Sequence, residues 1–180
     1  MTDASVIVPF LAALVGNVGG QSGQLLHATV VESGGDGERV SEVWALPRFG
    51  AWEVYDKTNE ERRTHNPVHG LLIEDGKERQ VFPAEFGRAY PVPLAAQMLI
   101  PSAMPIWRVS DTWAVESVEP TSDILTMSLV SQDPAYDVRS VVQVSNSGVV
   151  VSFSYEGFEA ALTSLEVQGE RSRPSIWWGA

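Results

Sequence analysis

Apolar and polar residues alternate most regularly in the segment from residue 137 to residue 169. Two runs with a period of two flank the turn signal Asn-Ser-Gly at 146–148, and this period is typical of strands with one buried face. If the first two residues of that signal form the loop, Val142 pairs with Val151 and the apolar side chains share one face. The segment therefore predicts a three-stranded antiparallel meander.

The same alternation, punctuated by Gly, Pro and Asp, recurs along most of the chain. It predicts further strands at 24–32, 39–45, 51–56, 71–82 (a hairpin around Asp75 and Gly76), 112–118 and 123–130. Residues 57–68 are polar and have no apolar period, so we predict a solvated loop there. About ten strands joined by hairpin-like turns, with no βαβ alternation, predict a mainly β fold with short helices (α+β). Its core is a single strongly curved antiparallel sheet, a half β-barrel whose concave face is covered by helices.

Two apolar segments predict those helices. Residues 1–23 predict an N-terminal helix and linker. The helix, with Thr2 or Asp3 as its cap, turns Leu11, Leu14 and Val15 inward, and Pro9 limits it, either within the helix or as the first residue of a short segment that runs to Gly16. Residues 91–107 are rich in Ala, Met and Leu and bracketed by prolines, with a helix predicted at 94–100. We expect this insert to cover the concave face as an apolar lid.

The length of 180 residues predicts one domain, 1–180, in which the sheet spans 24–168 and a tail spans 169–180. A net charge of −11 disfavours nucleic acid as a partner. The absence of cysteine excludes disulfides and thiolate chemistry. The apolar run near the N-terminus is too short to cross a bilayer and lacks a basic start, so we expect no transmembrane segment and a cytoplasmic location.

Motifs for catalysis or metal binding are weak. His65 and His69 stand four residues apart, but Pro67 lies between them, so a solvated loop is favoured over a metal site. The sequence contains no Gly-x-Ser-x-Gly motif and no phosphate-binding loop. We therefore expect a protein that is not an enzyme and has no cofactor.

Three stretches resemble the LolA-like group of bacterial proteins, which includes lipoprotein carriers, lipid-binding lipoproteins and anti-sigma regulators of the RseB type. They are VWALPRFGAWEV at 43–54, LIEDG at 72–76 with its return strand, and the closing meander at 138–167. The resemblance covers roughly residues 24–168. It implies a half-barrel of ten or eleven strands that encloses a hydrophobic cavity under a helical lid.

The favoured hypothesis is a non-catalytic protein that binds a hydrophobic small molecule, such as a lipid or an acyl chain, in the concave face. Aromatic, methionine and valine side chains are the candidate lining. They are Trp44, Trp52, Phe82, Met98, Trp107, Trp113, Met127, Val142, Val151 and Phe153. The alternative is a protein-interaction or regulatory module without a small-molecule ligand, which docks a protein partner on a sheet edge or through Trp177 and Trp178 in the tail.

Overall fold

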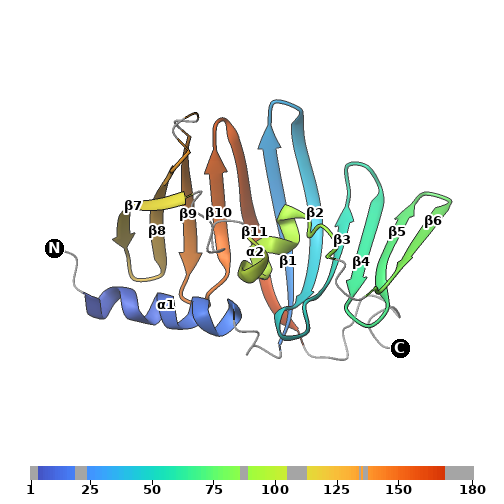
Figure 1. Cartoon of the computed structure of the whole chain (residues 1–180), viewed down its shortest axis with the longest axis horizontal. Helices are drawn as coiled ribbons and strands as arrows, with labels where there is room; N and C mark the ends of the chain where they lie inside the picture. Colours follow the sequence, from blue (N-terminus) through green and yellow to red (C-terminus); the bar gives the residue numbers. More distant parts are fainter. Residues whose placement is uncertain are drawn as a thin grey trace.

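The structure is a computed structural model, which describes residues 4–18, 24–85, 89–104, 113–133, 135 and 138–168. Within these residues the chain forms one eleven-stranded antiparallel sheet, two α-helices and two short 3-10 helices (Figure 1). The strands are β1 (Leu25–Gly34), β2 (Gly37–Leu46), β3 (Ala51–Asp56), β4 (Glu61–Asn66), β5 (Gly70–Asp75), β6 (Glu78–Pro83), β7 (Trp113–Pro120), β8 (Ile124–Ser131), β9 (Arg139–Ser145), β10 (Val150–Tyr155) and β11 (Phe158–Gln168). The helices are α1 (Ala4–Val18), η1 (Pro47–Phe49), α2 (Leu94–Leu99) and η2 (Pro101–Ala103).

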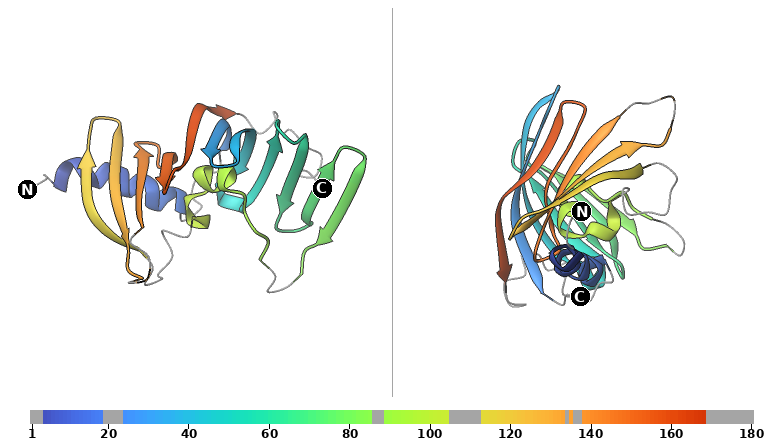
Figure 2. Two further views of the ribbon diagram at one scale, coloured as in Figure 1. Left: turned by 90° about the horizontal axis from the view of Figure 1, so that it is seen from above. Right: turned by 90° about the vertical axis from the view of Figure 1, so that its left-hand side faces the viewer.

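The strand order is β6-β5-β4-β3-β2-β1-β11-β10-β9-β8-β7. Two meanders, β1–β6 and β7–β11, are joined in the middle because the first strand pairs with the last, from Leu25 opposite Gln168 to Ser33 opposite Glu159. The sheet is strongly curved, and both helices lie on its concave side (Figure 2). The predicted fold class is therefore confirmed.

The centre of the concave face is a closed core. Phe10 and Leu14 of α1 are buried, and so are Met98 and Leu99 of α2. They belong to one hydrophobic cluster with the inward side chains of the sheet, such as the fully buried Val142. Helix α2, in the described part of the segment predicted to cover the sheet, lies on the concave face (Figure 2) and belongs to the same hydrophobic cluster as the valines of the meander.

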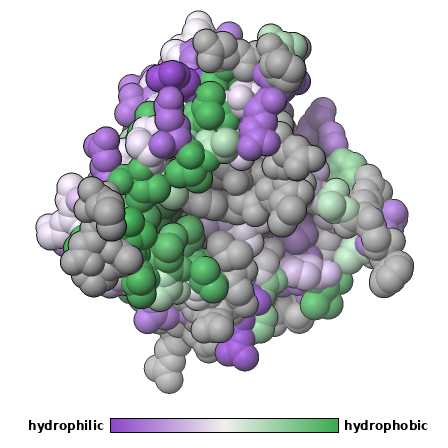
Figure 3. Space-filling view, turned by 60° about the vertical axis from the view of Figure 1, so that its left-hand side comes forward, coloured by the Kyte–Doolittle hydropathy of each residue, from purple (hydrophilic) through white to green (hydrophobic). Residues whose placement is uncertain are grey.

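Helix α1 differs from the prediction. It runs from Ala4 to Val18 with Pro9 inside it. Leu14 is buried as predicted, but the other inward residue is Phe10, whereas Leu11 is 43% and Val15 is 65% exposed. Both faces of the helix are apolar, so the spacing of apolar residues could not decide which face points inward. Figure 3, which brings the left-hand side of Figure 1 forward, shows hydrophobic side chains gathered on the side where α1 lies. Among the described residues, no helix is long and apolar enough to cross a membrane.

The prediction of a loop at 57–68 is wrong, because Glu61–Asn66 form strand β4 between β3 and β5. Its side chains alternate between the two faces, but they are polar and are paired with other polar groups. Arg62 forms an ion pair with Glu53 of β3, and Arg63 forms one with Glu61. The one fully buried residue of β4 is Thr64, which donates a hydrogen bond to Glu53, so the strand shows no apolar period and the pattern predicted a loop.

The predicted register of the β9–β10 hairpin is also wrong. Val142 lies opposite Phe153 and not Val151, and the ladder is irregular between Val150 and Ser152. The loop has three residues, because the Ser145 N–H bonds to the Val149 carbonyl at 3.0 Å. Its last residue, Gly148, has a φ of 76°, and this left-handed conformation lengthens the turn by one residue.

Candidate functional site

An apolar pocket with a volume of about 310 Å³ opens beside α2. One wall comes from α2 and the residues that follow it, and the opposite wall comes from β7 and the β10–β11 hairpin. Its lining residues are Leu94, Gln97, Met104, Trp113, Phe153, Tyr155 and Phe158. The centre of the concave face is filled, and in this pocket apolar surface of the concave side stays open.

The wall on the hairpin is a row of aromatic rings. Phe153 and Tyr155 are two residues apart on β10 and therefore share a face, and Phe158 lies opposite Tyr155 across the turn. The ring centroids are 5.6 Å apart for the first pair and 5.4 Å apart for the second, with tilted planes. These distances are within the range of favourable aromatic pairs, so the three rings hold one another in place in the pocket wall.

Gln97 brings a polar group to the apolar pocket. Its Nε2 donates a hydrogen bond to the Val92 carbonyl at 2.6 Å, which fixes the orientation of the amide because a carbonyl only accepts. The amide oxygen Oε1 is buried and has no hydrogen-bond partner among the described residues. The hydrogen bond to Val92 thus holds this side chain in place, and its oxygen is not exposed.

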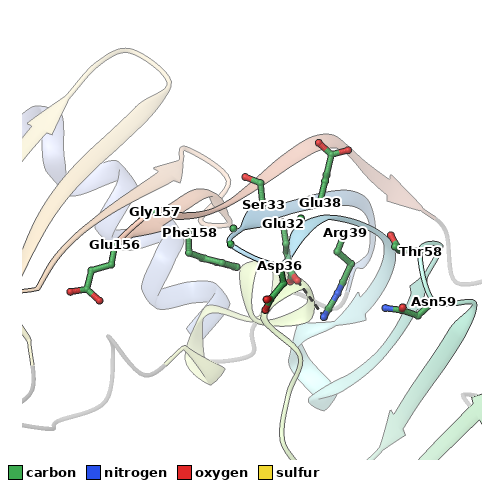
Figure 4. A pocket seen from close by; sticks show the side chains of 13 residues that line it. Glu32, Ser33, Asp36, Glu38, Arg39, Thr58, Asn59, Glu156, Gly157 and Phe158 are labelled. Carbon is green, nitrogen blue, oxygen red and sulfur yellow. Dashed lines mark ion pairs between the residues drawn. The ribbon is translucent and has the colours of Figure 1, made fainter.

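Two further pockets adjoin the apolar pocket at the rim of the concave face, and we call them the acidic pockets. Their volumes are about 310 and 410 Å³, and Glu32, Arg39, Asn59 and Phe158 line both. Figure 4 shows the larger one, in which the tips of the β1–β2 and β10–β11 hairpins and the β3–β4 turn face a common space. Phe158 also lines the apolar pocket, so the three spaces meet at this side chain.

The carboxylates of the acidic pockets are held by the fold. Burial raises the pKa of Glu32, and this effect exceeds the opposing effects of Arg39, at 3.5 Å, and of the Ala95 backbone N–H. For Asp56, burial also acts to raise the pKa, but hydrogen bonds from Asn59 and Thr58 and the charge of Arg39 outweigh it, so the pKa is lowered. The guanidinium of Arg39 lies 3.4 Å from Asp56 and is thus shared between two carboxylates.

His65 lies at a separate pocket of about 310 Å³, with Tyr90 and Pro67 among its lining. Its Nδ1 donates a hydrogen bond to the Gly50 carbonyl at 3.0 Å, so the proton of the neutral ring is on Nδ1. The ring stacks on Trp52, with centroids 5.5 Å apart. These contacts fix the ring of His65 within strand β4. Among the described residues, no group of three or more His, Cys, Asp or Glu side chains could hold a metal ion.

His65 predicts how stability depends on pH. Burial lowers its pKa, and the hydrogen bond to Gly50 opposes this only in part. The unfolded chain therefore binds the proton more tightly, so stability is full above about pH 6.5 and decreases as the pH falls toward the lower pKa of the folded state. We expect a lower free energy of unfolding at about pH 5.5 than at about pH 7.5, measured by urea denaturation. His65→Gln should reduce this difference, whereas His69→Gln should not, and an equal effect of both would contradict the assignment.

The ten predicted lining residues lie in several environments. Two of them, Trp113 and Phe153, line the apolar pocket. Four are buried in the core, namely Trp52, Met98, Met127 and Val142, and two pack against the core from partly exposed positions, namely Phe82 and Val151. Trp44 is on the opposite face of the sheet, and Trp107 is outside the described residues. Trp177 and Trp178 are also outside the described residues. Trp44 stacks on His27, with ring centroids 4.6 Å apart.

The pattern missed Phe158, Tyr155 and Glu32. Phe158 and Glu32 are on strands β11 and β1, which are adjacent in the sheet but far apart in sequence. A local pattern does not contain that pairing. The one signal that was available is the aromatic cluster Phe153, Tyr155 and Phe158 at the tip of a predicted hairpin, since such a cluster is rarely left fully in water.

No protein-family model and no curated protein sequence matches this chain. Among solved structures, an uncharacterized conserved protein from Thermus thermophilus matches with a TM-score of 0.55 and 9% identity over 88% of each chain. The complex of MucA and MucB from Pseudomonas aeruginosa matches with a TM-score of 0.47 and 10% identity, over 89% of this chain and 56% of that chain. A structure of MucB has a TM-score of 0.46 and 11% identity, over 96% of this chain and 63% of that chain. The Thermus protein shares the fold, and membership of the LolA-like group stays a prediction.

Proposed function

We propose that this protein is a non-catalytic binding protein that holds an apolar ligand, such as a lipid or an acyl chain, in the apolar pocket. The observation that carries this proposal is a concave space walled by Leu94, Trp113 and the aromatic row of the β10–β11 hairpin. Ligand pockets are typically concave and mostly apolar, with a few polar groups that orient the ligand. The neighbouring acidic pockets supply such groups.

The size of the pocket limits the ligand. Its volume of about 310 Å³ is at the lower end of the range of roughly 300–1,000 Å³ for small-molecule sites. The centre of the concave face is occupied by α2, whose Met98 and Leu99 are fully buried. We therefore propose a ligand with a single short chain or ring system in the pocket, in place of the large cavity under a lid that the family resemblance implies.

The alternative function is a module that docks a protein partner on a sheet edge or through Trp177 and Trp178, which lie outside the described residues. The two sheet edges are protected against such docking. Edge strand β7 contains an irregularity between Val115 and Ser117 and ends at Pro120. Edge strand β6 is only six residues long, begins with charged residues and ends at Pro83. Irregularities, charges and prolines are the features that hinder addition of a further strand. The apolar pocket therefore supports ligand binding over edge docking.

Binding of a neutral apolar probe tests the proposal. We expect N-phenylnaphthylamine to bind with a stoichiometry of one, measured from the fluorescence of the probe excited directly. Trp113→Ala removes a large part of one wall and should weaken binding about 10-fold, the effect of losing roughly 1.4 kcal/mol of apolar contact.

Val115→Ala is the matched control, because Val115 is on the same edge strand, is exposed and does not line the pocket. Its affinity for the probe should equal that of the wild type. Absence of saturable binding to the wild-type protein, or equal weakening by the two substitutions, would overturn the proposal.

A further inference from the structure

The acidic pockets carry an excess of negative charge. Their lining contains six carboxylates and two guanidiniums. The carboxylates are Glu32, Asp36, Glu38, Asp56, Glu61 and Glu156, and the guanidiniums are Arg39 and Arg63. Four negative charges are therefore left over at the rim of one concave face. A recess lined by charges of one sign attracts ions of the other sign and repels its own.

The arginines do not cancel this charge. Arg39 is shared between Glu32 and Asp56, and Arg63 pairs with Glu61. Among the described residues, no cation lies within ion-pair distance of Asp36 or of Glu156. The open side of the pockets therefore presents carboxylates that only solvent or a ligand can neutralise.

The charged and the apolar spaces adjoin. Leu94 and Phe158 line both the apolar pocket and the smaller acidic pocket, so they form the boundary between the two. Gly34 lets Phe158 pack close to β1, because a Cβ on Gly34 would lie 3.3 Å from the Phe158 ring. A molecule that extends from one space into the other would pass over these two side chains.

We infer that the ligand is a cationic amphiphile, with its apolar body in the apolar pocket and an alkylammonium headgroup in the acidic pockets. This inference rests on the proposed function, because it specifies the ligand of the same site. An anionic headgroup in that place would face the carboxylates of Glu32 and Asp56, both mostly buried, where water and salt screen the repulsion less than at an open surface. Fatty acids and anionic lipids are therefore the disfavoured ligands.

The test compares three amphiphiles with one chain length and different headgroups. Dodecylammonium, dodecanol and dodecanoate compete for bound N-phenylnaphthylamine at neutral pH, below the concentrations at which they form micelles. We expect dodecylammonium to bind about 10-fold tighter than dodecanoate at low salt, with dodecanol between them, because the carboxylates of the rim attract the ammonium group and repel the carboxylate group. The difference should shrink at about 0.5 M salt.

Removal of the rim charge should remove the preference. Asp36→Asn with Glu156→Gln removes two negative charges from the larger acidic pocket, at hairpin tips where the side chains are exposed. Asp75→Asn with Glu78→Gln makes the same change of charge at the β5–β6 hairpin, which does not line the acidic pockets. We expect the first pair to reduce the preference for dodecylammonium over dodecanoate about 3-fold and the second pair to leave it unchanged.

The outcomes separate the two proposals. Equal affinities for dodecylammonium and dodecanoate, with dodecanol still binding, would overturn the inference about the headgroup and leave the apolar pocket as a site. Failure of all three, and of the neutral probe, would overturn the proposed function itself. Equal effects of the two charge-neutralising pairs would show that the preference for dodecylammonium comes from the net charge of the chain and not from the acidic pockets.

Discussion

Replacing Gly148 by alanine is expected to lower the free energy of unfolding by about 3 kcal/mol. Gly148 has a φ of 76°, a conformation that L residues adopt at a cost. A Cβ at this position would also lie 2.4 Å from the carbonyl oxygen of Ala13, which is backbone of α1 and cannot rotate away. The β9–β10 turn thus packs directly against the backbone of α1, and a single methyl group at residue 148 would push the helix away from the turn.

Gly157→Ala separates the two parts of this effect. Gly157 ends the next hairpin with a φ of 78°, but no atom lies within 4 Å of the place where its Cβ would be. The substitution Gly157→Ala should lower the free energy of unfolding by about 1 kcal/mol, which is the strain of the backbone alone. Urea denaturation gives both free energies, and hydrogen exchange of the α1 amides should accelerate in Gly148→Ala alone. Equal losses of stability in the two variants would show that contact with α1 contributes nothing.

The sequence predicted those elements that carry their own local signal. The meander shows a period of two, the β5–β6 hairpin has Asp75 and Gly76 at its turn, and α2 is bracketed by prolines. Each of these signals lies within a few residues of the element it predicts. This is why their positions were right although no tertiary contact was known.

The predictions from sequence were wrong where contacts between distant parts of the chain determine the local structure. The register of β9 and β10 depends on a three-residue loop whose Gly148 rests on α1, and nothing in the loop sequence announces that helix. Strand β4 is held by ion pairs with its neighbours, so its side chains carry no apolar period. Both faces of α1 are apolar, so the choice between Leu11 and Phe10 as the inward residue is made by the sheet.

The candidate site was predictable only in part, for the same reason. An apolar insert covering a curved sheet indicated the concave face, and Trp113 and Phe153 do line the pocket there. Its charged half depends on the pairing of β1 with β11, which brings Glu32 and Phe158 to one rim. Strand pairing over such a distance leaves no trace in the local pattern of either strand.

Replacing Arg62 by methionine is the other substitution expected to have a large effect, about 3 kcal/mol of destabilisation. The Glu53 side chain is 0% exposed, and Arg62 neutralises it from the adjacent strand while Thr64 donates a hydrogen bond at 3.3 Å. Arg62 also lies over the ring of Tyr55, 5.1 Å from its centroid. Methionine preserves much of the apolar contact but leaves a buried carboxylate without a counter-charge, and this uncompensated charge is the main cost.

The double variant Glu53→Gln with Arg62→Met identifies the cause. If the cost comes from the uncompensated charge, neutralising Glu53 should recover more than half of the stability lost in Arg62→Met, measured by urea denaturation at pH 7. Arg63→Met is the matched control on the same strand, because its partner Glu61 is 25% exposed, and it should lose less than about 1 kcal/mol. Equal losses for Arg62→Met and Arg63→Met, or no recovery in the double variant, would mean that packing of the arginine stem and not charge holds β4 in the sheet.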